Sequence, residues 1–217
     1  MIFGKIEYLN LLPFHVFMKR FTKGSSAKMS MEHKRGVPAV INGAFHHRRV
    51  DAAFISSISA KNARHVKLGI IAKKDVKSVI VIPSTNSMDD TESASSNVLA
   101  KILNVQGEVV IGDKALRYSL KNSDYVDLAK LWNEKHDLPF VFALLCFHKD
   151  KKPYKKIESE FLKHKIKIPQ YILEKAAKKT RINKYEILNY LKLISYNVDY
   201  RAQLALKKFY KEAKKVL

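Results

Sequence analysis

Cysteine, glycine and proline are all scarce in this chain of 217 residues, which contains 1 Cys, 7 Gly and 6 Pro. The single cysteine, Cys146, cannot form an internal disulfide and leaves no CxxC pair for a zinc or redox site. This usage predicts a cytoplasmic protein. With 47% hydrophobic and 10% aromatic residues, the composition excludes wholesale disorder and predicts a chain that buries a core.

Long apolar runs are also missing. The longest uncharged apolar run, 138–147, is well short of the roughly 18 residues that a membrane span needs. We interpret it as a buried strand and expect no transmembrane segment. Glu7, Asn10 and Pro13 interrupt the apolar stretches of residues 1–17, and no small-residue cleavage site follows a basic start. We therefore expect folded structure there, not a signal peptide.

Acidic residues are few beside the basic ones, with 20 Asp and Glu against 41 Lys and Arg and a formal net charge of +21. Residues 151–217 hold 19 of the basic residues and only 6 of the acidic ones. Such basicity is compatible with nucleic-acid binding. However, RNP-like aromatics, a zinc-finger spacing and a glycine-rich RNA clamp are all absent from the sequence. We interpret the lysines as solvated helix faces and expect no nucleic-acid partner.

Signatures of several enzyme classes are absent as well. The sequence segments that we consider as site candidates contain no HExxH motif, no glycine-rich phosphate loop and no Ser, His and Asp in the order of a catalytic triad. Its one histidine pair, His46 and His47, would point about 100° apart on a helix, which favours a solvated pair over a metal site. Glu92 and Asp113 lie near expected helix starts, where acidic side chains favour the helix dipole. We expect neither a metal nor a cofactor.

Short apolar runs alternate with helical patterns over the first two thirds of the chain, which indicates an α/β domain. The expected strands are Met1 to Tyr8, Ala52 to Ile55, Val66 to Ala72, Val76 to Ile82, Val109 to Ile111, Tyr125 to Asp127 and Phe140 to Phe147. The expected helices are Pro13 to Phe21, Val37 to His46, Ser57 to Ala63, Ser95 to Leu103, Lys114 to Leu120 and Leu128 to Lys135. From Tyr154 onward the periodicity predicts helix throughout.

Two of the expected strands are rich in β-branched or aromatic residues and are flanked by turn chemistry. They are Val76 to Ile82, which ends at Pro83, and Phe140 to Phe147, which follows Pro139. Strands that cross at these positions would divide the chain into two lobes. We expect lobe 1 to comprise residues 1–76 and 148–217, and lobe 2 to comprise residues 77–147.

Small polar residues stand where expected strands end and helices begin, the edge at which open α/β sheets bind ligands. Helix N-termini with free amides and hydroxyls suit a carboxylate. Each residue also has a structural interpretation, because Ser and Asn are ordinary helix caps and turn residues. Ser78 differs, since a hydroxyl on a crossing strand is either satisfied in the core or contacts a ligand. The candidates are Asn10, Ser56, Ser57, Ser78, Ser95 and Ser96.

A series of short segments in a fixed order gives the chain a family resemblance. The segments are Tyr8-Leu9-Asn10, Gly36-Val37-Pro38, Asp51 to Ser57, Val76 to Val79, Glu92 to Ser96, Ile111 to Leu116, Asp127-Leu128 through Trp132 to Ala143, Tyr190-Leu191 and Ile194 to Tyr196. In this order they resemble the chorismate dehydratases of the futalosine route to menaquinone, nearly end to end. The chain is shorter than that family usually is, and Ser95-Ser96 stands where Thr-Ser is more usual.

The resemblance implies an α/β, two-lobed fold like that of type II periplasmic binding proteins, with an interdomain cleft and a helical C-terminal segment. It also implies a cofactor-free hydro-lyase that removes water from chorismate to give 3-[(1-carboxyvinyl)oxy]benzoate. On this basis Asn10 and Ser78 would be catalytic and orient the reacting ring and its hydroxyl. Ser56, Ser57, Ser95 and Ser96 would hold the two carboxylates. The proton acceptor would be a substrate carboxylate or a residue outside this set.

Two other functions fit the same resemblance. A solute-binding protein of this fold would use the cleft without chemistry, but such proteins are normally exported, and no signal peptide is expected here. A sister enzyme, 1,4-dihydroxy-6-naphthoate synthase, shares the fold and is expected to carry a catalytic histidine in its second lobe. Lobe 2 offers only His136, on an apparent surface helix end.

Overall fold

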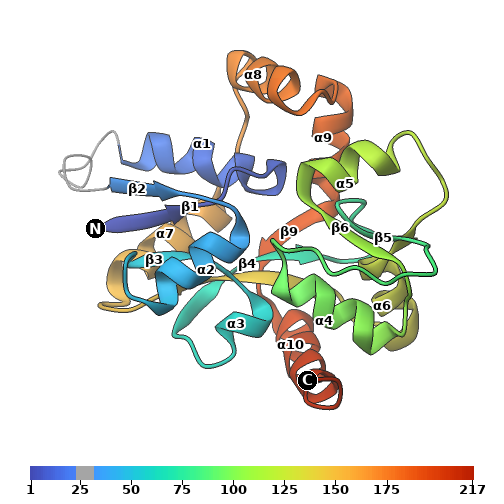
Figure 1. Cartoon of the computed structure of the whole chain (residues 1–217). Helices are drawn as coiled ribbons and strands as arrows, with labels where there is room; N and C mark the ends of the chain where they lie inside the picture. The colour runs from blue at the N-terminus through green and yellow to red at the C-terminus, as the bar shows by residue number, and fades with distance from the viewer. Residues whose placement is uncertain (23–31) are drawn as a thin grey trace.

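The structure is a computed structural model that describes residues 1–22 and 32–217. Within these residues the strands form a six-stranded sheet in the order β2-β1-β3-β8-β4-β9 and a three-stranded sheet in the order β6-β5-β7. The larger sheet contains β1 (Ile2–Lys5), β2 (Glu32–Arg35), β3 (Ala52–Ser56), β4 (His65–Ala72), β8 (Phe140–Phe147) and β9 (Ile194–Asn197). The smaller sheet contains β5 (Val79–Ile82), β6 (Glu108–Ile111) and β7 (Val126–Asp127). Figure 1 shows β1 to β3 and the smaller sheet on opposite sides of the molecule.

The chain crosses twice between the two sheets. β1 runs parallel to β2 and β3, whereas β8 lies antiparallel between β3 and β4, and β9 pairs with the other edge of β4. In the smaller sheet the central β5 is antiparallel to both neighbours. Residues 73–78 lead from β4 into the smaller sheet, and residues 137–139 lead back into β8. The fold is therefore two-lobed, as expected.

Helices surround both sheets (Figure 1). Several begin at a side chain that accepts a hydrogen bond from a backbone N–H of the first turn, as Ser93 does for α4 and Asp127 for α6. Pro13 and Pro38 lie instead in the first turns of α1 and α2. The helical segments are η1 (Leu9–Leu11), α1 (Leu12–Phe21), α2 (Pro38–His46), α3 (Ser57–Ala60), α4 (Ala94–Leu103), α5 (Gly112–Ser119), α6 (Leu128–His136), α7 (Lys152–Lys163), α8 (Gln170–Thr180), α9 (Lys184–Leu193) and α10 (Tyr200–Ala213).

Most expected elements are present within a few residues, but the fold corrects the secondary-structure prediction in two places. β9 interrupts the C-terminal region expected to be helical throughout, and it pairs with β4. β2 was not expected, because its charged sequence lacks apolar alternation. β8, which the prediction gave to lobe 2, lies in the larger sheet. We propose that lobe 1 is built on the six-stranded sheet, including β8, and that lobe 2 is built on the three-stranded sheet.

The apolar run that ends at Phe147 forms strand β8, and its side chains are mostly buried, as predicted. Cys146 lies on this strand and is fully buried. Burial raises the pKa of its thiol to about 12, so it packs as a small apolar group. Among the described helices, none combines the length and the apolar character needed to cross a bilayer.

One carboxylate ties the first crossing to lobe 2. Asp127 Oδ2 accepts hydrogen bonds from the backbone N–H groups of Val76 at 2.8 Å and Lys77 at 2.7 Å. Its Oδ1 accepts from Ala129 N at 2.9 Å and Lys130 N at 3.1 Å, at the start of α6. Burial raises the pKa of Asp127, while the amide hydrogen bonds act in the opposite direction. The buried side chain therefore satisfies backbone donors of two segments.

The second crossing is tied to the same helix. Trp132 of α6 is fully buried, and its indole Nε1 donates a hydrogen bond to the carbonyl oxygen of Pro139 at 3.1 Å. Its ring also contacts that of Phe140 edge to face, with 5.4 Å between the centroids. Helix α6 thus holds both segments that join the lobes.

The loss of the Asp127 carboxylate should destabilise the whole fold. We expect Asp127→Ala to lower the free energy of unfolding by about 2 to 4 kcal/mol, because it leaves two crossing amides unpaired and removes a helix cap. Urea unfolding followed by circular dichroism measures this change. The matched control is Asp89→Ala, whose side chain is 55% exposed and forms an ion pair with Lys101, and which should cost less than about 0.5 kcal/mol. Equal effects of the two substitutions would contradict the anchoring role.

Candidate functional site

A cleft lies between the two sheets and is walled by both lobes. The space between its atoms amounts to about 620 Å³, a figure that includes space open to solvent. Tyr8 is its one ionisable lining side chain, and no lysine, arginine or carboxylate is among the described residues that line it. The lining residues are Ile6, Tyr8, Asn10, Leu11, Pro38, Phe54, Ser56, Ile70, Val76, Ser78, Val79, Ser93, Ser96, Ile111, Gly112, Phe142 and Ala143.

Asn10 enters this cleft from lobe 1. It is the middle residue of the short helix η1, between β1 and α1. Its carbonyl oxygen accepts a hydrogen bond from the Tyr196 hydroxyl at 2.6 Å. Within the described part of the chain no hydrogen bond involves its side chain, so the amide is free to donate and accept toward a ligand.

Ser78 enters the cleft from the first crossing, one residue before β5, and is buried. The hydroxyl of Tyr190, from α9, donates a hydrogen bond to Ser78 Oγ at 2.9 Å. The Ser78 carbonyl oxygen accepts from Gly112 N at 2.8 Å, which fixes the backbone at the start of α5. Because Ser78 Oγ accepts the hydrogen bond from Tyr190 on the side away from the cleft, its own O–H group is available to donate into the cleft.

Of the serine pair at the end of β3, one residue faces the cleft. Ser56 lines it, and its Oγ accepts from Asn42 Nδ2 at 2.8 Å and donates to Ser59 Oγ at 3.1 Å. Ser57 is fully buried, and its hydroxyl donates to the carbonyl oxygen of Val141 on β8. The Ser57 side chain is therefore engaged behind the wall of the cleft.

The start of α4 shows the same division. Ser96 lines the cleft together with Ser93, whose hydroxyl donates to Ser96 Oγ at 2.7 Å and accepts from Ser96 N at 3.2 Å. Ser95 is buried away from the cleft, and its Oγ accepts from Ile58 N at 3.0 Å, across the lobe boundary. Asn10, Ser56, Ser78 and Ser96 are thus brought together, whereas Ser57 and Ser95 support the walls.

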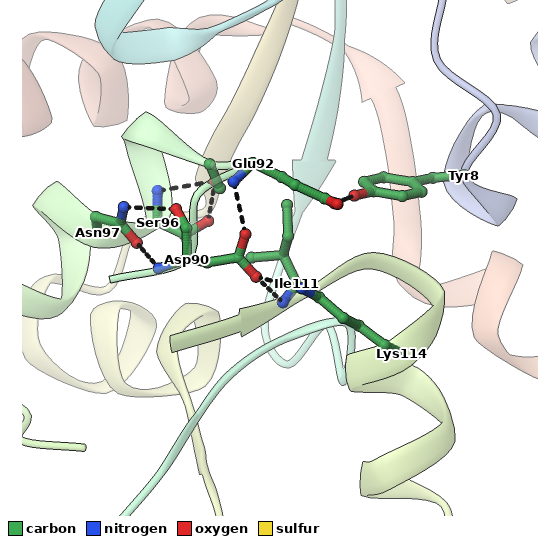
Figure 2. A network of polar contacts seen from close by, with 8 residues as sticks. Tyr8, Asp90, Glu92, Ser96, Asn97, Ile111 and Lys114 are labelled. Atoms are coloured by element: carbon green, nitrogen blue, oxygen red, sulfur yellow. Dashed lines mark hydrogen bonds and ion pairs between the residues drawn. The ribbon is translucent and has the colours of Figure 1, made fainter. Parts of the chain in front are cut away.

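A polar network joins the lobes beside these residues (Figure 2). The Tyr8 hydroxyl of lobe 1 donates a hydrogen bond to Glu92 Oε2 of lobe 2. Glu92 N donates to Asp90 Oδ1 at 2.8 Å, and Lys114 Nζ lies 2.9 Å from Asp90 Oδ2. The side chain of Asp90 is only 1% exposed, and its Oδ2 also accepts from Ile111 N at 3.3 Å. This carboxylate fixes the loop before α4 against the start of α5.

The sequence prediction gave Tyr8 no role and Glu92 only a dipole role. The two residues are 84 positions apart, so no local spacing links them. Burial and the neighbouring Glu92 raise the pKa of Tyr8, which keeps the phenol protonated and a donor.

Other contacts hold the lobes together near the cleft. Asp113 Oδ1, in the first turn of α5, accepts from Leu9 N of lobe 1 at 3.0 Å. Burial raises the pKa of Asp113, while the bond from Leu9 acts in the opposite direction. Arg117 Nη1 donates to the carbonyl oxygen of Thr180 at 3.0 Å. The lobes are therefore closed on each other.

Glycine is required at position 112, where the start of α5 in lobe 2 approaches the ring of Tyr8 in lobe 1. Its φ is +69°, and a Cβ at this position would lie 2.7 Å from Tyr8 Cζ. Only glycine combines a positive φ with this close approach to the ring. The first residue of α5 thus lets Tyr8 reach Glu92.

Comparison with known proteins identifies the family. A family model for menaquinone biosynthesis matches residues 99–215, more than half of the chain. A curated chorismate dehydratase from Campylobacter jejuni subsp. jejuni is 45% identical over 99% of this chain and 98% of its own length. The chain belongs to this menaquinone-biosynthesis family.

Solved structures similar to this family member establish the fold class. AF1704 from Archaeoglobus fulgidus superposes with a TM-score of 0.74 at 15% identity, covering 99% of this chain and 96% of that one. The periplasmic aliphatic sulphonate binding protein SsuA from Escherichia coli gives a TM-score of 0.58 at 13% identity, covering 97% and 86%. CA3427 from Candida albicans, which has the generic periplasmic binding protein fold, gives 0.56 at 11% identity, covering 99% and 90%. The periplasmic-binding-protein-like fold was therefore predicted correctly.

The histidines of this menaquinone-biosynthesis protein lie outside the cleft. His46 and His47 are exposed, and a ring nitrogen of His47 lies 2.8 Å from the carbonyl oxygen of Gly43. His136 ends α6, with its ring against that of Trp132 at 4.2 Å between centroids. Within residues 1–22 and 32–217, no three His, Cys, Asp or Glu side chains are grouped so as to hold a metal ion.

Substitution at Gly112 tests the close approach of the lobes. We expect Gly112→Ala to lower the free energy of unfolding by about 1 to 3 kcal/mol, because the new Cβ meets the Tyr8 ring and φ is positive. The control is Gly43→Ala, in the interior of α2 with nothing within 4 Å of the new Cβ, which should raise it by about 0.5 to 1 kcal/mol. Urea unfolding measures both. A neutral Gly112→Ala would mean that the lobes do not close as described.

Proposed function

We propose that this protein is a chorismate dehydratase, a hydro-lyase that converts chorismate into 3-[(1-carboxyvinyl)oxy]benzoate on the cytoplasmic futalosine route to menaquinone. The observation that carries this proposal is the 45% identity to the Campylobacter jejuni chorismate dehydratase over nearly the full length of both chains. The partner we propose is the small molecule alone, with neither nucleic acid nor membrane. The single, buried Cys146 is consistent with a reducing compartment.

The cleft supplies neutral donors for the two carboxylates of chorismate. Ser96 and Ser93 stand at the N-terminus of α4, and Gly112 begins α5, so two helix N-termini and two hydroxyls adjoin the same space. Ser56 adds a hydroxyl from the other lobe, whose proton would turn from Ser59 Oγ toward the bound carboxylate. We assign carboxylate binding to Ser56 and Ser96, and we assign Ser57 and Ser95 the support of those two walls.

Asn10 and Ser78 are placed to act on the ring. In the reaction a proton leaves one ring carbon, the hydroxyl of the adjacent carbon leaves as water, and the electron pair of the broken C–H bond completes the aromatic ring. The Ser78 hydroxyl, which accepts from Tyr190, donates a hydrogen bond to the leaving hydroxyl, and the proton taken from the ring carbon departs with that hydroxyl as water. The Asn10 amide holds a substrate hydroxyl or carboxylate in the reactive orientation.

The proton acceptor that we propose is a carboxylate of the substrate. Tyr8 is the one ionisable side chain among the described lining residues, and its hydroxyl donates a hydrogen bond to Glu92. A phenol held in this way is a poor base at neutral pH. The protein then positions the substrate and excludes water, while the substrate supplies the base.

Neither alternative function has an observation in its favour. Similarity to SsuA at 13% identity concerns the fold alone. The residue that could serve as the histidine expected of a 1,4-dihydroxy-6-naphthoate synthase, His136, packs against Trp132 outside the cleft.

Turnover of chorismate tests the proposal directly. Purified protein incubated with chorismate should form an aromatic product that has lost one water, detected by liquid chromatography and mass spectrometry. Activity should persist after exhaustive treatment with EDTA, because the lining hydroxyls and amides are poor metal ligands. Chorismate recovered unchanged would refute the function, and activity restored only by added metal would refute the cofactor-free mechanism.

Asn10→Ala separates catalysis from structure. A positioning amide should cost about 10²-fold or more in kcat, with the melting temperature nearly unchanged. Asn122→Ala, at an exposed residue outside the cleft, serves as the control and should leave both quantities unchanged. If Asn10→Ala lowers the melting temperature while kcat per folded molecule stays at the wild-type value, Asn10 is a turn residue and has no role in the reaction.

A further inference from the structure

We propose that Tyr190 and Tyr196, from the C-terminal segment, are positioning residues that orient Ser78 and Asn10 from behind the cleft. This inference rests on the proposed dehydratase function of the cleft. All described residues that line the cleft lie at or before Ala143, so the C-terminal segment contributes no wall residue. It reaches the site through these two hydroxyl groups.

Tyr190 sets the direction of the Ser78 proton. It lies on α9, is 4% exposed, and donates to Ser78 Oγ at 2.9 Å. A serine hydroxyl has one proton and two lone pairs. One lone pair of Ser78 Oγ accepts the hydrogen bond from Tyr190, which lies behind the wall of the cleft. The serine O–H bond then points away from Tyr190 and toward the cleft that Ser78 lines. Without this bond the hydroxyl rotates among several orientations.

Tyr196 acts on the neighbouring residue through the backbone. It lies on β9, and its hydroxyl donates to the carbonyl oxygen of Asn10 at 2.6 Å. Its ring meets that of Phe161 edge to face, with 5.1 Å between the centroids, which fixes the direction of the phenol. The helix η1 that carries Asn10 is only three residues long, so this contact holds its orientation in the cleft.

Both phenols remain donors at neutral pH. Burial raises the pKa of Tyr190 and of Tyr196 well above the usual value of a tyrosine. The two residues lie at the junction of α9 and β9, where the chain turns from helix into the edge strand beside β4. One short stretch of chain therefore contacts both predicted catalytic residues.

A double-mutant cycle tests the action of Tyr190 on Ser78. Tyr190→Phe should lower kcat about 10-fold and change KM less than about 2-fold, because the lost interaction matters mainly in the transition state. In the Ser78→Ala background the same substitution should change kcat less than about 2-fold. The control is Tyr154→Phe, which removes a buried hydroxyl that donates to Met1 Sδ outside the cleft, and which should leave kcat unchanged.

Tyr196→Phe provides a second, independent variant. It should lower kcat about 5-fold in the wild-type background and less than about 2-fold in the Asn10→Ala background. Melting temperatures measured for every variant exclude loss of folded protein as the cause.

The outcomes separate this inference from the proposed function. An active wild-type enzyme, impaired by Ser78→Ala but unaffected by Tyr190→Phe and Tyr196→Phe, would overturn the positioning role alone. Full additivity in both cycles would also overturn it, because the tyrosines would then act independently of Ser78 and Asn10. A wild-type protein inactive on chorismate would overturn the function first and this inference with it.

Discussion

The attachment of both crossings to helix α6 is the constraint on which the site depends. Asp127 binds the amides of Val76 and Lys77, and Ser78 is the next residue along the chain. Trp132 holds the other crossing through the carbonyl oxygen of Pro139. Because the crossing segment is fixed in this way, Ser78 has one position relative to both lobes. The part of the cleft wall that this segment forms is fixed with it.

The cleft is neutral although the protein carries a net charge of +21. Long-range attraction from surface lysines raises the encounter rate with a dianion but is screened by salt and does not select its shape. Hydroxyls, an amide and helix N-termini act at close range and in fixed directions, so they orient the ligand. A lysine in the wall would also form an ion pair with the substrate carboxylate that we propose as the base and reduce its basicity. The separation of charge from the cleft is therefore consistent with substrate-assisted proton removal.

Local patterns in the sequence indicate where strands end and helices begin, but not which way each side chain faces. Asn10 and Ser56 stand at the exits of the parallel strands β1 and β3, and both line the cleft, because parallel strands end at one edge of a sheet. The pattern could not distinguish Ser56 from Ser57, since adjacent residues at a helix start differ only in the direction they face. Strand β9 was predicted to be helix because its pairing with β4 is a tertiary contact. The bond between Tyr8 and Glu92 depends on lobe closure, which no spacing in the sequence encodes.

The closed lobes also set the energetics of substrate entry. Contacts such as Tyr8 to Glu92 and Leu9 to Asp113 join the lobes beside Asn10 and Ser78. Each such hydrogen bond is worth only about 0.5 to 1.5 kcal/mol net, because water replaces it in the open form. A dianion that contacts Ser56 in one lobe and Ser96 in the other adds binding energy only when the lobes close. On the proposed function, substrate binding therefore favours the closed form, in which water is excluded and the ring lies against Asn10 and Ser78.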